Sequence, residues 1–101
     1  MERDFPVQSY EMMVCFRPDL EEEAAGALPQ RLETLIGNQG GAITKENSMG
    51  RRRLAYPIRH YHEGLYQVVN FSLPPENVEH LNRQILLDED ILRHLVIREG
   101  E

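Results

Sequence analysis

Apolar residues alternate with other residues in two segments of the chain, residues 9–16 and 65–73. A period of two is typical of β-strands, because successive side chains point to opposite faces of a sheet. Arg17-Pro18 ends the first strand and Pro74-Pro75 ends the second, since proline cannot donate a ladder hydrogen bond. The alternation therefore predicts two strands, each with one face toward a core.

Two other segments repeat their apolar residues at helical spacing. The first helix is expected to begin after Asp19 as its N-cap and to end at Gly37-Asn38, and Pro29 inside it predicts a kink or a broken first half. The second helix is expected over residues 75–87. The predicted core packs the helix residues Leu28, Leu32, Leu35, Val78, Leu81 and Ile85 against the strand residues Met12, Val14, Val69 and Phe71.

Two further strands complete the pattern. Residues 42–59 form a long strand-like segment, the tract HYHEG is the expected turn with its centre near Glu63-Gly64, and residues 91–97 form a last strand that is apolar on both faces. Two right-handed crossovers in this order predict an α+β fold of the ferredoxin-like split βαβ type (βαββαβ). A four-stranded antiparallel sheet in the order 4-1-3-2 would carry two helices on one face and leave the other face open.

Length and composition fit one small globular domain. At 101 residues we expect a single ferredoxin-like domain over residues 1–101, with residues 1–8 as a flexible N-terminal extension. No apolar run approaches the roughly 20 residues of a membrane span, and the first residues lack the features of a secretion signal. A single cysteine, Cys15, fits a reducing, cytoplasmic setting.

The charge of the chain is unevenly distributed. The whole chain has a net charge of −6, but residues 42–62 contain five basic residues and one acidic residue, a net +4, which leaves −10 for the rest. The stretch GRRRLAYPI at residues 50–58 joins three consecutive arginines directly to an apolar, strand-like run. Such a field can present a basic patch to a polyanion from an acidic body.

The arginine triplet indicates phosphate binding, because the planar guanidinium fork matches phosphate oxygens. We expect RNA contacts from Arg51, Arg52, Arg53, Arg59, Lys45 and Tyr56. Two interpretations of the tyrosine stay open, stacking on an exposed base and packing at the rim of the core. The arginines likewise have a second interpretation, as solvated residues of an exposed strand.

The motifs of common catalytic, nucleotide and metal sites are absent, including the Walker loop, GxGxxG, CxxC, HExxH and GxSxG. His60, His62 and Glu63 are close in sequence, but a metal site needs further ligands and none is indicated. We therefore expect no enzymatic activity, no metal and no cofactor. The remaining alternative to RNA binding is a small-molecule regulatory domain, since this fold serves many such modules.

Four features of the chain resemble one known family, the bacterial small-subunit ribosomal protein six. These features are Tyr10-Glu11 in the first strand, Pro18-Asp19 before the helix, Gly50–Ile58 in the form GRR-x-LAYPI, and a closing strand of the form D-x-(I/V)-(L/I)-R-x-(L/M)-V at residues 88–97. The resemblance covers about residues 9–98. GRR-x-LAYPI is its most specific part, because nine ordered positions rarely arise by chance.

The resemblance implies a structural protein of the cytoplasmic ribosome, without a membrane partner. It would bind small-subunit ribosomal RNA in the central domain, or platform, together with ribosomal protein eighteen and other small-subunit components. The RNA or partner contacts that it carries over are Arg51, Arg52, Tyr56 and Arg93. Arg53 occupies a variable position of the family, so its predicted RNA contact rests on its charge alone. The family usually has basic residues where this chain has Gln8 and Ser9, and Arg3 is the candidate to replace them.

Overall fold

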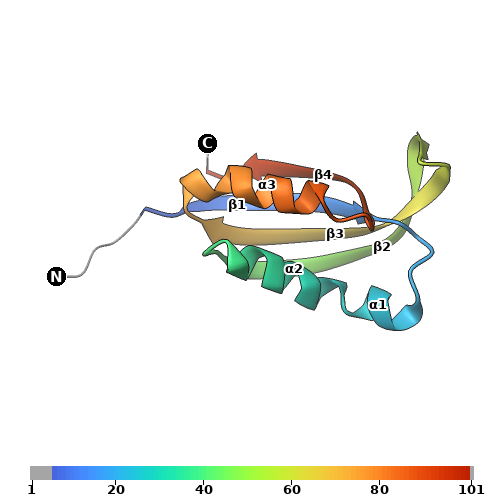
Figure 1. Cartoon of the computed structure of the whole chain (residues 1–101), viewed down its shortest axis with the longest axis horizontal. Helices are drawn as coiled ribbons and strands as arrows, with labels where there is room; N and C mark the ends of the chain where they lie inside the picture. Colours follow the sequence, from blue (N-terminus) through green and yellow to red (C-terminus); the bar gives the residue numbers. More distant parts are fainter. Residues whose placement is uncertain (1–5, 101) are drawn as a thin grey trace.

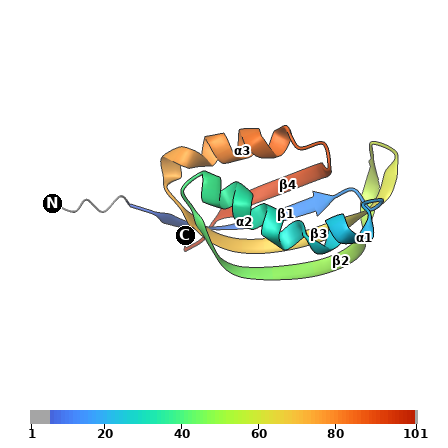
Figure 2. The same cartoon turned by 60° about the horizontal axis from the view of Figure 1, so that its bottom comes forward.

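The four strands form a single antiparallel sheet, with its helices on one face (Figures 1 and 2). The computed structural model describes residues 6–100. The elements are β1 (Gln8–Phe16), α1 (Glu22–Gly26), α2 (Leu28–Asn38), β2 (Ala42–Ile58), β3 (Tyr61–Leu73), the 3-10 helix η1 (Pro75–Asn77), α3 (Val78–Leu86) and β4 (Ile91–Arg98). The sheet order β2-β3-β1-β4 confirms the predicted ferredoxin-like topology.

The expected first helix is broken in two, as Pro29 predicted. Pro29 lies in the first turn of α2, where a missing N–H costs little, and α1 ends just before it. The prediction that Asp19 caps this helix is wrong, since α1 begins at Glu22. The carboxylate of Asp19 instead accepts hydrogen bonds from Arg17 and Tyr61, two donors that compete with the helix N-terminus.

The core lies between the sheet and the helices and matches the prediction. Val14 and Val69 are fully buried, and the Tyr10 and Phe71 rings stack with their centroids 5.6 Å apart. The buried cluster comprises Tyr10, Met12, Val14, Phe16, Leu28, Leu32, Ile36, Val69, Phe71, Leu73, Leu81, Ile85 and Ile91, with Leu35 and Val78 partly buried against it. Burial of this apolar surface is the main force that stabilises the fold.

The turn between β2 and β3 lies at Arg59-His60, so the prediction of a turn near Glu63-Gly64 is wrong. Ile58 pairs with Tyr61 across the turn, and Gly64 lies inside β3. Gly64 is needed for a close approach, because a Cβ at this position would lie 2.2 Å from Cys15 Sγ. Gly64 in this sequence thus marks a close contact between neighbouring strands and not a turn.

The long strand β2 is irregular near the turn. Arg53 pairs with Glu63 and Ile58 pairs with Tyr61, so residues 54–57 lie opposite His62 alone. An earlier irregularity falls at Gly50, whose positive φ of 76° favours glycine. The far end of the β2–β3 hairpin consequently projects from the sheet, at the right of Figures 1 and 2.

Candidate nucleic-acid interface

The projecting end of the β2–β3 hairpin gathers most of the predicted RNA-binding residues. All six predicted side chains on β2 and its turn are exposed: Lys45, Arg51, Arg52, Arg53, Tyr56 and Arg59. Lys45 lies apart from the others, because it pairs with Asn70 whereas Arg51 pairs with Leu65. Six residues of strand separate it from the triplet by roughly 20 Å. Arg3 lies outside the described residues.

The three consecutive arginines differ in their surroundings. Arg51 Nη1 makes an ion pair of 3.1 Å with Glu63 Oε1, and its Nη2 donates to the Pro18 carbonyl at 3.5 Å. Arg52 Nε donates to the carbonyl oxygen of Met49 at 3.0 Å. The guanidinium of Arg53 makes no hydrogen bond or ion pair with any residue from 6 to 100. Arg53 is therefore the member of the triplet with all its donors available to a ligand.

Arg52 and Arg53 border a shallow hollow of about 320 Å³ on the open face of the sheet. The other residues that line it are Met13, Met49, Tyr66 and Val68. A charged rim around an apolar floor is suited to a macromolecular surface that carries both phosphates and apolar groups.

Tyr56 lies beside Arg93 at the same end of the sheet. Its ring is 59% exposed, and its hydroxyl accepts a hydrogen bond of 3.5 Å from Arg93 Nη1. This contact joins the bulged part of β2 to β4, so two residues that are far apart in sequence form one exposed pair. An exposed aromatic ring beside a guanidinium offers a platform on which a base can stack.

The open face continues from this pair as an apolar surface. Exposed fractions are 45% for Met13, 51% for Leu95 and 49% for Ile97, and Met13 pairs with Leu95 on the neighbouring strand. Burial raises the pKa of the Cys15 thiol, which lies beside this surface. No site is predicted on this surface from the sequence, although the apolar residues on both faces of the last strand were a signal for it.

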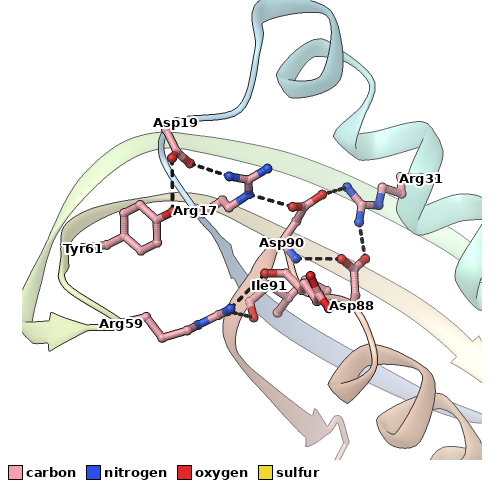
Figure 3. Close-up of polar contacts among 9 residues, drawn as sticks. Arg17, Asp19, Arg31, Arg59, Tyr61, Asp88, Asp90 and Ile91 are labelled. Atoms are coloured by element: carbon pink, nitrogen blue, oxygen red, sulfur yellow. Dashed lines mark hydrogen bonds and ion pairs between the residues drawn. The ribbon is translucent and has the colours of Figure 1, made fainter.

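A network of charged side chains lies behind the hairpin turn (Figure 3). Asp90 accepts 2.7 Å and 3.0 Å contacts from Arg17 and Arg31, and Arg31 also pairs with Asp88. Burial would raise the pKa of Asp90, but the hydrogen bonds from the two arginines outweigh it and lower that pKa below its usual value.

Arg59 belongs to this network and differs from the other arginines of the hairpin. Its Nη1 donates to the Glu89 carbonyl at 3.0 Å and its Nη2 to the Ile91 carbonyl at 2.7 Å. One terminal nitrogen thus contacts the loop between α3 and β4, and the other contacts the first residue of β4 (Figure 3). RNA contact by Arg59 stays a prediction, and two of the five N–H donors of its guanidinium are already bonded to backbone carbonyl oxygens.

Within residues 6–100, no group of three histidine, cysteine or acidic side chains is arranged to hold a metal ion. His60 and His62 are both exposed on the hairpin. None of the helices described is long and apolar enough to cross a membrane.

Comparison with known proteins gives one consistent result. A family model described as "Ribosomal protein S6" matches residues 9–98. The chain is 43% identical over 96 residues to "Small ribosomal subunit protein bS6" of Syntrophomonas wolfei, covering 94% of this chain and 99% of that protein. The bS6 protein of Desulforamulus reducens is 37% identical over 95 residues, with 94% and 100% covered. A crystal structure of 30S ribosomal protein S6 from Thermotoga maritima superposes with a TM-score of 0.85 at 29% identity, covering 93% of this chain and 89% of that one.

Proposed function

This chain belongs to the ribosomal protein S6 family, and we propose that it binds small-subunit ribosomal RNA together with ribosomal protein eighteen. Membership of the family makes it a non-enzymatic component of the small subunit of the cytoplasmic ribosome, which confirms those expectations. The alternative of a small-molecule regulatory domain has no support among these relatives.

The exposed arginines of the β2–β3 hairpin are the observation that carries the RNA part of the proposal. They concentrate a net charge of +4 in residues 42–62 of a chain whose total is −6. A phosphate backbone that met this end of the sheet would release condensed counterions, whereas the acidic helix face would repel it. The RNA is therefore proposed to lie against the hairpin end, with Arg53 and the Tyr56–Arg93 pair in contact.

The open sheet face supports a protein partner beside the RNA. Met13, Leu95 and Ile97 are each about half exposed and lie on neighbouring strands. Such a surface is apolar in its centre and bordered by the arginines at positions 52, 53 and 93. Ribosomal protein eighteen is proposed to cover this face and to extend the positive surface that meets RNA.

Joint binding gives the test. The purified chain should bind a central-domain fragment of small-subunit RNA weakly, because only one end of an acidic molecule is basic. Affinity measured by filter binding should rise when ribosomal protein eighteen is added. Equal affinities with and without that protein would contradict joint binding, and failure of the chain to co-sediment with small subunits at moderate salt would contradict the proposal as a whole.

A further inference from the structure

The turn of the β2–β3 hairpin adopts a conformation that its residues disfavour. Arg59 and His60 have positive φ angles of 49° and 72°, although neither is glycine. L-residues with side chains of this size rarely adopt the left-handed region unless the surrounding structure holds them there. The turn also receives little support from the sheet, because residues 54–57 interrupt the pairing behind it.

Two side chains attach this turn to the body of the protein (Figure 3). Arg59 donates to the carbonyl oxygens of Glu89 and Ile91, at 3.0 Å and 2.7 Å. Tyr61 donates its hydroxyl proton to Asp19 Oδ2 at 3.1 Å. We refer to these contacts of Arg59 and Tyr61 as the clasp.

The clasp is connected to further hydrogen bonds of the body. Asp19 also accepts a 3.1 Å bond from Arg17, and Arg17 in turn donates to Asp90 from its side chain at 2.7 Å and from its backbone N–H at 2.8 Å. Asp90 is held from the other side by Arg31. The turn is therefore attached to the end of β1 and to the α3–β4 loop at once.

We propose that Arg59 is a positioning residue, which holds the hairpin end in the conformation that binds RNA and does not itself neutralise a phosphate. The inference rests on the proposed RNA-binding function. A hairpin end that is already ordered loses less conformational entropy on binding than one that must be ordered by the RNA. The guanidinium is suited to this role because its planar fork reaches two carbonyl oxygens at once, which the point charge of lysine cannot reproduce.

Two substitutions of Arg59, one that keeps its charge and one that removes it, distinguish a positioning role from a phosphate contact. Arg59→Gln and Arg59→Lys should both weaken RNA binding by roughly three- to tenfold. This is the affinity lost when binding must order one additional side chain. The slope of log K against log salt should stay as in the wild type for both. A phosphate contact predicts the opposite pattern: the slope falls by up to about 0.9 in Arg59→Gln, and Arg59→Lys binds like the wild type.

Two arginines serve as controls for the loss of one charge. Arg53→Gln should lower the salt slope, because Arg53 has free donors on the hairpin. Arg83→Gln, an exposed arginine in the last turn of α3, should leave affinity and slope unchanged. Absence of salt-dependent binding in the wild type would contradict the proposed function, whereas a slope that responds to Arg53→Gln but also to Arg59→Gln would contradict only the positioning role.

Tyr61→Phe tests the clasp without any change of charge. It should weaken RNA binding at an unchanged slope, and the double variant with Arg59→Lys should lose less than the sum of the two effects, because both loosen one attachment. Hydrogen exchange of the free protein should be faster in residues 54–61 of either variant while the amides of β1 stay protected. Unchanged exchange in the hairpin, or unchanged RNA affinity in both variants, would overturn the proposal.

Discussion

The two faces of the sheet are built from the same strands and have opposite surroundings. On the covered face of β1, Met12 and Val14 are completely buried under the helices. Their neighbour Met13, on the other face, is 45% exposed and pairs with Leu95, which is 51% exposed. Both faces are apolar near the centre, so hydrophobicity alone does not distinguish them. The helices decide which face stabilises the fold and which is available to partners.

The polar atoms buried with the covered face have their hydrogen-bond partners within the chain. The open face and the hairpin end leave apolar surface and hydrogen-bond donors exposed. Across the described residues, every buried side-chain nitrogen and oxygen atom has a hydrogen-bond partner. The open face instead combines half-exposed apolar side chains with the donors of Arg53, for which residues 6–100 provide no partner. Substitutions on the covered face should therefore change stability, and those on the open face should change binding.

Val14→Asp should have the largest effect. An unpaired charge in this fully buried position costs about 3–5 kcal/mol, a large part of the roughly 5–15 kcal/mol that stabilises a small domain. Met13→Asp, one residue away on the open face, should fold with a cooperative thermal transition. Circular dichroism during heating compares the two, and a Val14→Asp protein that melts at the same temperature as Met13→Asp would show that the phase of β1 is wrong.

Gly64→Ala should destabilise the protein by about 1–3 kcal/mol, because an added methyl group forces close-packed neighbours apart. Its Cβ would lie 2.2 Å from Cys15 Sγ and 3.2 Å from the Phe16 carbonyl oxygen. Gly37→Ala is the matched control, since nothing lies within 4 Å of a Cβ in that helical position. Urea unfolding should show a loss only for the first variant, and equal midpoints would contradict the close contact between β3 and β1 at Gly64.

Leu95→Ser should leave the thermal melt nearly unchanged and weaken the binding of ribosomal protein eighteen. Truncation of a hot-spot residue near the centre of an interface costs more than about 1 kcal/mol, and we expect Leu95 to be such a residue. Leu87→Ser removes a leucine that is even more exposed, at 74%, but lies at the end of α3. Calorimetric titration should show weaker binding for Leu95→Ser alone. If both variants bind like the wild type, the open face is not the partner surface.

Substitution of Asp90, in the charged network behind the hairpin turn, should have the smallest effect on stability, and this effect should depend on pH. The folded-state pKa of Asp90 lies below its ordinary value of 3.8, so its stabilising contribution is complete above about pH 5 and is lost as the pH falls through that folded pKa. For this partly exposed group the contribution should be below about 1 kcal/mol. Asp90→Asn should be less stable than the wild type at pH 7, and the difference should vanish near pH 2. A constant difference between pH 7 and pH 2 in urea unfolding would contradict this role.

The fold could be predicted from the sequence because local signals agreed with it. The alternation around Val14 and Val69 fixed the covered face, and Pro29 marked the break between the first two helices. Signals that depend on distant contacts were misjudged. Gly64 is required by Cys15 across the sheet, and Asp19 is drawn from the helix by Arg17 and Tyr61. No local pattern contains such pairings.

The same limit applies to the candidate interface. The charge run identified the hairpin, and the resemblance added Arg93 on a strand that lies 37 residues beyond Tyr56 in sequence. Arg53 and Arg59 belong to one basic segment, so RNA contact is expected equally from both on the basis of the sequence. Their difference lies in the carbonyl oxygens of Glu89, in the α3–β4 loop, and of Ile91, at the start of β4, which only the folded structure brings to Arg59.

The salt dependence of RNA binding tests most directly whether the arginine triplet binds RNA through phosphates. Arg51, Arg52 and Arg53 are replaced together by glutamine, and affinity for the central-domain RNA is measured at several salt concentrations beside a thermal melt. The slope of log K against log salt should flatten by roughly 1–3 units, while exposed positions should move stability by no more than about 0.5 kcal/mol each. Tyr56→Ala should lower affinity without a change of slope. A triple variant that keeps both the affinity and the slope of the wild type would contradict the account.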